Sequence, residues 1–252
     1  MHIVINTFTI MNKIIPNISV DCLVFGFDFE CLHILLNKRE MISEETGETI
    51  ISDYTLAGHH LLENENTDQA AYRILKQITG FDNIFLEQFY CFSKTDRLKE
   101  KDKMWIKHLN LNIPSHVFSI GYYALVDKSK LVLDEEHKNA HWFPINKLPE
   151  LGFDHADIIK KGIESLRKKF KEEPIGFELL PEKFTLSQLQ KLHEAIAGRS
   201  IDRRNFRKKI TQFKHVIPLD EKQTGVAHKP AKVYIFSKDV YERTKKEKMI
   251  VV

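Results

Sequence analysis

Two adjoining helical patterns near the end of the chain constrain its fold more than any other feature. Thr185 precedes a run in which leucine and isoleucine recur at helical spacing, and Gly198 follows the last of them. Thr favours the N-cap and Gly the C-cap of a helix, so the run is expected to form one helix. After three further residues, Asp202 can cap a second helix, RRNFRKKITQF. The sequence therefore predicts two helices joined by a tight turn.

The second of these helices is apolar on one side and cationic on the other. Two short strands follow it, HVIPL and KVYIF, joined by the basic loop DEKQTGVAHKP, whose Lys222 and His228 add to its charge. This order is typical of a winged helix-turn-helix, in which the second helix enters the major groove and the hairpin contacts phosphates. A basic helix that is merely solvated is the alternative. We predict that double-stranded DNA is bound by Thr185 (through the N-terminus of its helix), Arg203, Arg204, Asn205, Arg207, Lys208, Lys229 and Lys232.

The distribution of charge also separates the chain into two parts. Residues 183–252 contain 17 Lys+Arg and 7 Asp+Glu, a net charge of +10, whereas residues 1–182 contain 21 and 28, a net charge of −7. Pro174 prevents the preceding helix from continuing, so the connection is placed there. We predict two domains, residues 1–174 and 175–252, the second facing a polyanion.

The first part alternates strand and helix patterns. Residues 20–36 are expected to form a β-hairpin, residues 84–92 and 117–126 two further strands, and a helix to begin at Asp154 or His155. Residues 41–53 are polar and are predicted to be a loop, and the charged residues 98–115 a surface insertion.

The remaining composition describes an ordinary globular chain. No run of eighteen apolar residues exists, so no membrane span is expected. Residues 1–12 lack the features of a signal peptide and are expected to be disordered, and a cytoplasmic location follows. The three cysteines show no metal-ligand spacing, and buried reduced thiols are expected for Cys22, Cys31 and Cys91.

Residues 57–81, AGHHLLENENTDQAAYRILKQITGF, combine a glycine turn, a polar capping stretch, an amphipathic helix and a terminal glycine. The segment resembles the Nudix box. The final glycine of that motif falls on Gly80, its arginine on Arg73 and its first glutamate on Glu65, whereas three other glutamates fall on Ile74, Gln77 and Ile78. We expect Glu65 and Arg73 to form an ion pair and Gly80 to cap the helix.

The resemblance implies what these replacements change. Nudix hydrolases use Mg²⁺ or Mn²⁺ to cleave a nucleoside diphosphate linked to another group, and such cations need several oxygen ligands on one face of the helix. Two isoleucines and an amide do not supply them. We therefore expect neither catalytic residues, bound metal nor cofactor, and predict that the chain is not an enzyme. An active hydrolase of ADP-ribose or a related compound, with rearranged ligands, is the alternative.

Together the two parts resemble the Nudix-related transcriptional regulators of the NrtR and AraR type. The segments that carry this resemblance include EPIGFELLPEKFTLSQLQKLHEAI at 173–196 and KPAKVYIF at 229–236. It implies an α+β fold, with an N-terminal Nudix-like α/β/α sandwich around a mixed sheet and a C-terminal winged helix-turn-helix. It also implies a homodimer that binds a palindromic operator.

The resemblance further implies a sugar or nucleotide-sugar effector and a role in pentose-type carbohydrate metabolism. The residues predicted to bind this effector are Arg39, His59, Asp96, Arg97 and Tyr122. Arginine and aspartate can hydrogen-bond sugar hydroxyls, and tyrosine can stack on a sugar ring. A surface ion pair for Asp96 and Arg97, and a core position for Tyr122, are the alternatives. A sensor that binds a protein partner through its basic domain is a third function.

Overall fold

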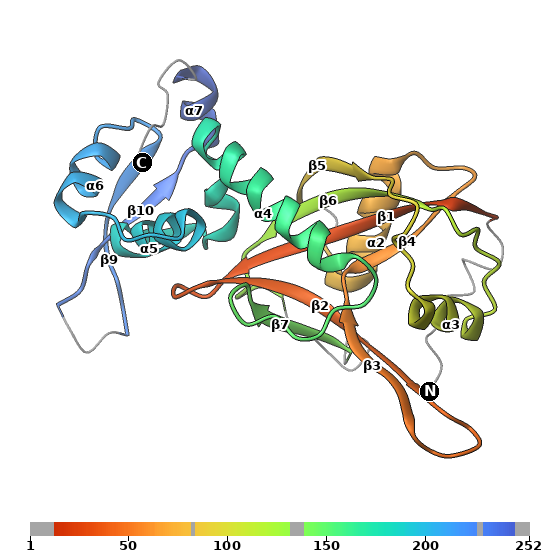
Figure 1. Cartoon of the computed structure of the whole chain (residues 1–252). Helices are drawn as coiled ribbons and strands as arrows, with labels where there is room; N and C mark the ends of the chain where they lie inside the picture. The colour runs from red at the N-terminus through yellow and green to blue at the C-terminus, as the bar shows by residue number, and fades with distance from the viewer. Residues whose placement is uncertain (1–12, 82–83, 132–138, 226–228, 245–252) are drawn as a thin grey trace. The chain divides into compact units, whose positions relative to one another are not determined.

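A computed structural model describes residues 13–81, 84–131, 139–225 and 229–244 (Figure 1). The chain divides into two compact units. The first comprises residues 1–24, 34–124 and 132–163, and the second comprises residues 25–33, 125–131 and 164–252. In the described ranges no helix is long and apolar enough to cross a membrane. The predicted disorder of residues 1–12 lies outside the described residues.

A seven-stranded sheet occupies most of the first unit. Five strands follow the order β3-β2-β1-β6-β5, while β4 pairs with β1 and β7 pairs with β2. The strands are β1 (Ile14–Phe27), β2 (Leu32–Ile42), β3 (Thr49–Thr55), β4 (Ala57–Leu62), β5 (Phe85–Phe92), β6 (Phe118–Val126) and β7 (Ala140–Pro144). The predicted hairpin and both further predicted strands are confirmed.

Helices α2 (Thr67–Thr79) and α4 (His155–Glu172) cover opposite faces of this sheet (Figure 1). Two consecutive residues of β1, Cys22 and Leu23, contact different helices. The Cys22 thiol lies 3.9 Å from the Ala71 carbonyl oxygen of α2, whereas a Cβ on Gly162 of α4 would lie 2.4 Å from Leu23 Cδ2. Successive side chains of a strand point to opposite faces, so one helix lies on each side.

The prediction of a loop over residues 41–53 holds for residues 43–48 and is wrong for the two ends of the range. Strands β2 and β3 extend into this segment and pair antiparallel, with Arg39 opposite Asp53 and Met41 opposite Ile51. Polar residues suggested a loop, but Met41 and Ile51 are buried within them and pack with Trp105. One apolar face is enough to fix a strand when a neighbouring element covers it.

Residues 98–115 are also more than a surface insertion. They contain helix α3 (Glu100–His108), in which Trp105 and Asp102 are buried. Trp105 contributes to the small cluster with Met41 and Ile51. The high charge of this segment concealed the two residues that attach it to the sheet.

The second unit contains the predicted helices and wing. Helix α5 runs from Leu186 to Ala197 and α6 from Arg203 to Ile210, and a three-stranded sheet has the order β8-β10-β9. The remaining bounds are η2 (Ile175–Leu179), β8 (Lys183–Thr185), β9 (Val216–Lys222), β10 (Lys232–Phe236) and α7 (Lys238–Thr244). Helix α6 is three residues shorter than the sequence pattern, and α7 was not expected from the sequence.

The three thiols do not share one environment. Cys22 is buried, but Cys31 is half-buried and Cys91 is exposed. The expectation of three buried thiols is therefore wrong for Cys31 and Cys91. Cys91 lies near the end of β5, where the neighbouring Tyr90 is exposed as well, although the sequence around them is apolar.

Candidate nucleic-acid interface and ligand site

Side-chain hydrogen bonds fix the turn between α5 and α6. The Thr185 hydroxyl accepts a hydrogen bond from the Gln188 N–H at 3.2 Å, and Gly198 ends α5 in the left-handed conformation, with φ of 71°. Glu194 Oε1 then accepts the Ile201 N–H at 2.8 Å. Asp202 begins α6 by accepting the Asn205 N–H at 2.8 Å. The second helix is thus held in a defined orientation on the first.

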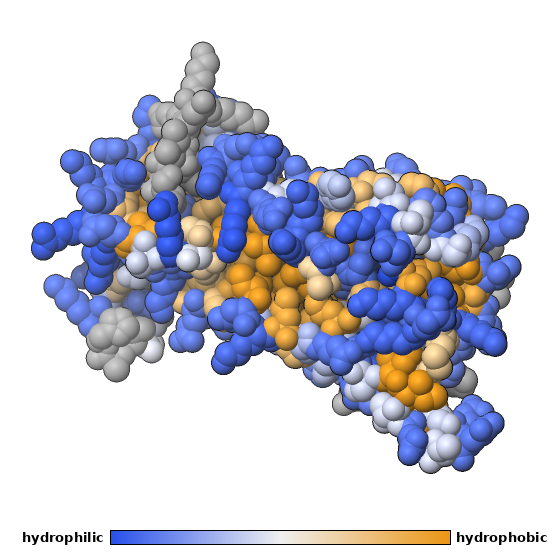
Figure 2. Space-filling view, viewed as in Figure 1, coloured by the Kyte–Doolittle hydropathy of each residue, from blue (hydrophilic) through white to orange (hydrophobic). Residues whose placement is uncertain are grey.

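Helix α6 separates an apolar side from a cationic side. Phe206 and Ile210 are 1% and 0% exposed, and the Phe206 ring lies 5.2 Å from the His193 ring. The predicted DNA-binding residues of this helix, all exposed, are Arg203, Arg204, Asn205, Arg207 and Lys208. In Figure 2, hydrophilic side chains cover the part of the molecule where Figure 1 places α6. The burial of two residues therefore directs five polar side chains to solvent.

The remaining residues of the predicted interface differ in exposure. Lys229 and Lys232 of the wing are exposed, whereas Thr185 is only 5% exposed. Because the Thr185 hydroxyl caps α5, its side chain is occupied, and only the N–H groups of that helix end can serve a phosphate. His228 lies outside the described residues.

The turn before α2 is held by the predicted ion pair. Arg73 Nε donates to Glu65 Oε2 at 2.9 Å, and Glu65 Oε1 also accepts the Leu62 N–H at 3.0 Å. Burial raises the pKa of the Glu65 carboxyl, but these hydrogen bonds lower it more, so it lies below its usual value. Arg73 donates further to the His60 carbonyl oxygen at 3.3 Å. The ion pair and the C-cap at Gly80, with φ of 70°, are confirmed.

The three positions that differ from the Nudix pattern do not gather carboxylates. Ile74 is buried at 3% exposure, Ile78 is half-buried and Gln77 is exposed. Glu65 is engaged by Arg73 with both oxygens, so it is poorly placed to bind a cation. Arg73 instead serves to close the turn over the start of α2.

His59 and His60 lie on β4 beside this turn. Gly58, just before them, is the one residue that fits there, because a Cβ would lie 2.2 Å from Asp21 Oδ1. His59 Nδ1 lies 3.0 Å from the His60 carbonyl oxygen, and His60 Nδ1 lies 3.2 Å from that of Ile18. Burial lowers the pKa of both imidazoles, so both are neutral at pH 7.

Tyr122 projects from β6 toward the start of α2 and is 1% exposed. Its hydroxyl lies 2.9 Å from Thr67 Oγ1 and 3.0 Å from Gln88 Oε1, and it also donates to Asp68. Burial and the adjacent Asp68 carboxylate raise the pKa of Tyr122 to about 12. The hydroxyl, not the ring face, is the part of Tyr122 that meets polar groups.

The Arg39 side chain is buried and forms hydrogen bonds with two carboxylates of the chain. It donates to both Asp53 oxygens at 2.7 Å and to Asp102 Oδ1 at 2.9 Å, and it is 2% exposed. Its guanidinium carbon lies 4.6 Å from the centre of the Phe153 ring. Because Asp102 belongs to α3, Arg39 attaches that helix to the sheet.

Asp96 and Arg97 do not form a pair with each other. Arg97 donates to both oxygens of Asp154 at 2.6 and 2.8 Å, and to the Val117 carbonyl oxygen at 3.2 Å. Asp96 is exposed. Both residues line a hollow of about 220 Å³ together with Asp154 at the start of α4.

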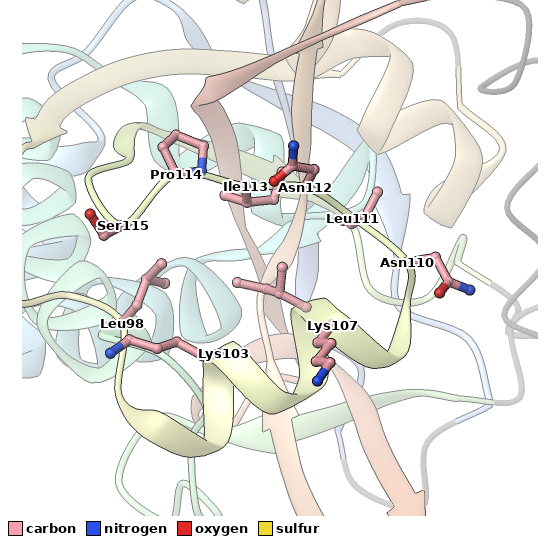
Figure 3. A pocket seen from close by; sticks show the side chains of 10 residues that line it. Leu98, Lys103, Lys107, Asn110, Leu111, Asn112, Ile113, Pro114 and Ser115 are labelled. Carbon is pink, nitrogen blue, oxygen red and sulfur yellow. The ribbon is translucent and has the colours of Figure 1, made fainter.

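A larger hollow of about 480 Å³ lies beside α3 (Figure 3). Helix α3 forms one side and the segment 110–115 the other. The lining combines apolar side chains with two lysines and two asparagines: Leu98, Lys103, Ile106, Lys107, Asn110, Leu111, Asn112, Ile113, Pro114 and Ser115. None of the five predicted effector residues lines it. The sequence pattern indicated only an insertion here. The apolar residues Met104, Trp105 and Ile106 within this charged segment were the signal for a helix.

The architecture defines a class of protein: a mixed α+β fold in which a Nudix-like sheet with covering helices precedes a C-terminal winged helix domain. A MutT/nudix family protein from Enterococcus faecalis has this fold, with a TM-score of 0.64, 23% identity and 88% of each chain covered. The predicted fold class is thereby confirmed.

Within that class the chain is similar to NrtR proteins. Residues 176–236 match the family model of the NrtR DNA-binding winged helix domain. The ADPR responsive transcriptional repressor NtrR of Acinetobacter baylyi is 24% identical over 230 residues, 90% of this chain and 84% of that protein. Shewanella oneidensis NrtR, solved with a 27mer DNA, has a TM-score of 0.68 at 23% identity, covering 89% of this chain and 95% of that one. These similarities confirm the predicted resemblance.

Proposed function

We propose that this chain is a DNA-binding transcriptional regulator with a ligand-sensing Nudix-like domain. Residues 175–252 bind DNA, and residues 1–174 bind a nucleotide-sugar effector and do not hydrolyse it by the usual Nudix mechanism. The regulator acts in the cytoplasm as a homodimer whose two winged helices read the half-sites of a palindrome.

The observation that carries the DNA-binding proposal is the two-sided burial of α6. Phe206 and Ile210 anchor the helix, and its exposed arginines and lysines extend away from that anchor. A helix fixed by its back and cationic on its front can enter a major groove without rearrangement. The similarity of residues 176–236 to the NrtR DNA-binding winged helix domain supports the same function.

DNA binding can be tested by selection from random sequences. The full chain is used to select duplexes from a random-sequence library, and the enriched duplex is measured by fluorescence anisotropy at several salt concentrations. We expect an inverted repeat and an affinity that falls steeply with salt, because each phosphate contact releases a counterion. Equal binding to the enriched duplex and to shuffled DNA at physiological salt would reject the proposal, and it would favour the protein-partner alternative.

ADP-ribose is the first effector to test, because the Acinetobacter baylyi relative is described as ADPR responsive. The hollow beside α3 is of suitable size, since ligand pockets commonly enclose about 300–1,000 Å³. Its lysines, Lys103 and Lys107, suit a diphosphate, and the amides of Asn110 and Asn112 suit hydroxyl groups. We propose this hollow as the effector site, with Arg39 and Arg97 holding its surroundings in place.

A thermal-shift experiment distinguishes the possible effectors. A ligand at 100 times its Kd stabilises the fold it binds by about 2.7 kcal/mol. ADP-ribose is compared with free pentoses, which test the predicted role in pentose metabolism. ADP-ribose is expected to raise Tm, and the double variant Lys103→Ala/Lys107→Ala to reduce that rise. A rise with arabinose alone would replace the nucleotide-sugar proposal by the pentose one.

The alternative of an active hydrolase is tested with the same protein. Formation of the nucleoside monophosphate (AMP from ADP-ribose) is measured with Mg²⁺ or Mn²⁺ across a panel of nucleoside diphosphate compounds that includes ADP-ribose. We expect no turnover above the protein-free rate, because Ile74, Gln77 and Ile78 supply no carboxylate. Turnover that Glu65→Gln abolishes would establish the hydrolase instead.

A further inference from the structure

The turn between β1 and β2 brings together three side chains that ligate metals. The carboxylate of Asp28, the thiol of Cys31 and the imidazole of His33 each offer one ligand atom, and these atoms all lie within 4.8 Å of one another. His33 is buried, Cys31 is half-buried and Asp28 is exposed. One side of the cluster is thus closed by protein and the other is open to water.

Backbone groups orient two of the three ligands. Asp28 Oδ1 accepts the N–H groups of Glu30 at 3.0 Å and Cys31 at 2.9 Å, which leaves Oδ2 directed at the cluster. His33 Nδ1 lies 3.2 Å from the Cys31 carbonyl oxygen, a partner for an Nδ1–H, which leaves the Nε2 lone pair for a metal. Metal-binding histidines in proteins are commonly fixed in this way.

The separations between the ligand atoms are at or above those of a tetrahedral zinc site. His33 Nε2 lies 3.4 Å from Asp28 Oδ2 and 3.9 Å from Cys31 Sγ. Ligands bound tetrahedrally at about 2.0–2.3 Å from zinc lie roughly 3.3–3.7 Å apart. The thiol also lies 3.8 Å from His33 Nδ1, and the three ligand atoms lie within 4.8 Å of one another, so the Cys31 side chain must rotate toward Nε2 when an ion binds.

We propose that Asp28, Cys31 and His33 bind a Zn²⁺ ion, with water as the fourth ligand on the open side. A thiolate and an imidazole favour zinc over the hard cations Mg²⁺ and Ca²⁺, which prefer oxygen ligands. The site uses none of the residues assigned above to DNA or effector binding, so it is independent of the proposed function.

The positive charge of Lys128 disfavours binding of a cation at this site. Its ammonium lies 3.8 Å from Asp28 Oδ2 and its side chain is 24% exposed. The flexible stem allows the ammonium to move to solvent when a cation enters. Removing this charge while keeping the stem, as in Lys128→Met, should therefore tighten zinc binding.

The test uses the full chain, with any affinity tag removed, after dialysis against a chelator. Co²⁺ replaces Zn²⁺ as a spectroscopic probe, and sulfur-to-cobalt charge-transfer absorption reports a bound thiolate. We expect one Co²⁺ per chain with this absorption, and its displacement by Zn²⁺. Cys31→Ser should abolish the absorption, and Cys91→Ser, which removes an exposed thiol elsewhere, should retain it.

Two further variants keep the test decisive if Cys31→Ser does not fold. Asp28→Asn retains the thiol and should weaken Zn²⁺ binding at least about tenfold in competition with a chromophoric chelator. Lys128→Met should strengthen it. The proposal is overturned if no thiolate absorption develops, if Cys91→Ser alone removes it, or if neither Asp28→Asn nor Lys128→Met changes the affinity.

Discussion

Helices α2 and α6 are built alike but present different outer faces. Each begins with a side-chain cap, Asn66 for α2 and Asp202 for α6, and each buries an apolar stripe. The outer face of α6 is almost entirely cationic. That of α2 mixes Tyr72, Lys76 and Gln77, with no cluster of one charge.

This difference indicates which part of each helix can interact. In α6 the exposed residues are suited to a ligand and the buried ones to stability. At α2 the oppositely charged groups Glu65, before the helix, and Arg73, within it, are bound to each other. The Glu65–Arg73 pair at α2 therefore stabilises a turn, whereas the exposed residues of α6 form a surface that a ligand can contact.

The largest expected effect is on the buried side of α6. Phe206→Ala should lower the free energy of unfolding by about 3–5 kcal/mol, because it leaves a cavity against α5. Chemical denaturation followed by circular dichroism measures the loss. Arg204→Ala, two residues away but exposed, should stay within about 0.5 kcal/mol. A loss under about 1 kcal/mol for Phe206→Ala would mean that the apolar stripe of α6 is not its anchor.

The second effect concerns the ion pair of α2. Arg73→Ala leaves Glu65 half-buried without its partner, and we expect a loss of about 2–3 kcal/mol, at or below the lower end of the range for a buried pair because water reaches this one. Lys76→Ala on the exposed side of the same helix serves as the matched control. Equal stability of the two variants would show that Arg73 does not hold the turn and is available for a ligand.

The third effect should appear in binding and not in stability. Arg203→Ala and Arg207→Ala are each expected to cost about 1–3 kcal/mol of affinity for the selected duplex, as is typical of contacts to base edges. Anisotropy titration at fixed salt measures this loss. Lys160→Ala, exposed on α4, should bind DNA like the unaltered chain. If it weakened binding equally, the effect would be one of net charge.

The smallest effect is a pH dependence of the free energy of unfolding that arises from His193 of α5. Burial lowers the pKa of His193 to about 3, so the folded chain keeps this imidazole neutral. Unfolding restores a pKa near 6.5, and the unfolded state then binds the additional proton. The stability contributed by His193 is therefore complete above about pH 6.5 and falls by about 1.4 kcal/mol per pH unit below it.

His193→Leu should remove that part of the slope when urea unfolding is compared between pH 7.5 and 5.5. The half-buried histidines His59 and His60 of the other unit, whose pKa burial also lowers, provide a background slope that the variant retains. An unchanged slope would contradict the burial of a neutral imidazole at this position.

The sequence was most informative where local rules and tertiary packing agreed. Caps at Thr185, Gly198 and Asp202 marked both ends of α5 and the start of α6, because these depend on neighbouring residues alone. The pair Glu65–Arg73 was predictable for the same reason, since a known turn joins them.

What could not be predicted depended on contacts distant in sequence. Asp102 and Arg39 are 63 positions apart, and nothing in the local pattern of α3 indicates that a charged residue is fully buried. The cluster of Asp28, Cys31 and His33 is local, but its spacing resembles no familiar metal motif. Only the fold of the turn places its ligand atoms together.

The attachment of α3 through Asp102 limits how this protein can vary. Asp102 accepts hydrogen bonds from Arg39 at 2.9 Å and from the Phe153 N–H at 3.1 Å. A homologue that shortened residues 98–115 would remove one of the two carboxylates that pair with the buried Arg39 and leave only Asp53, unless it also replaced Arg39 by a neutral residue. Loop length and the residue at position 39 should therefore change together, and a graft of this segment onto another scaffold must carry its arginine with it.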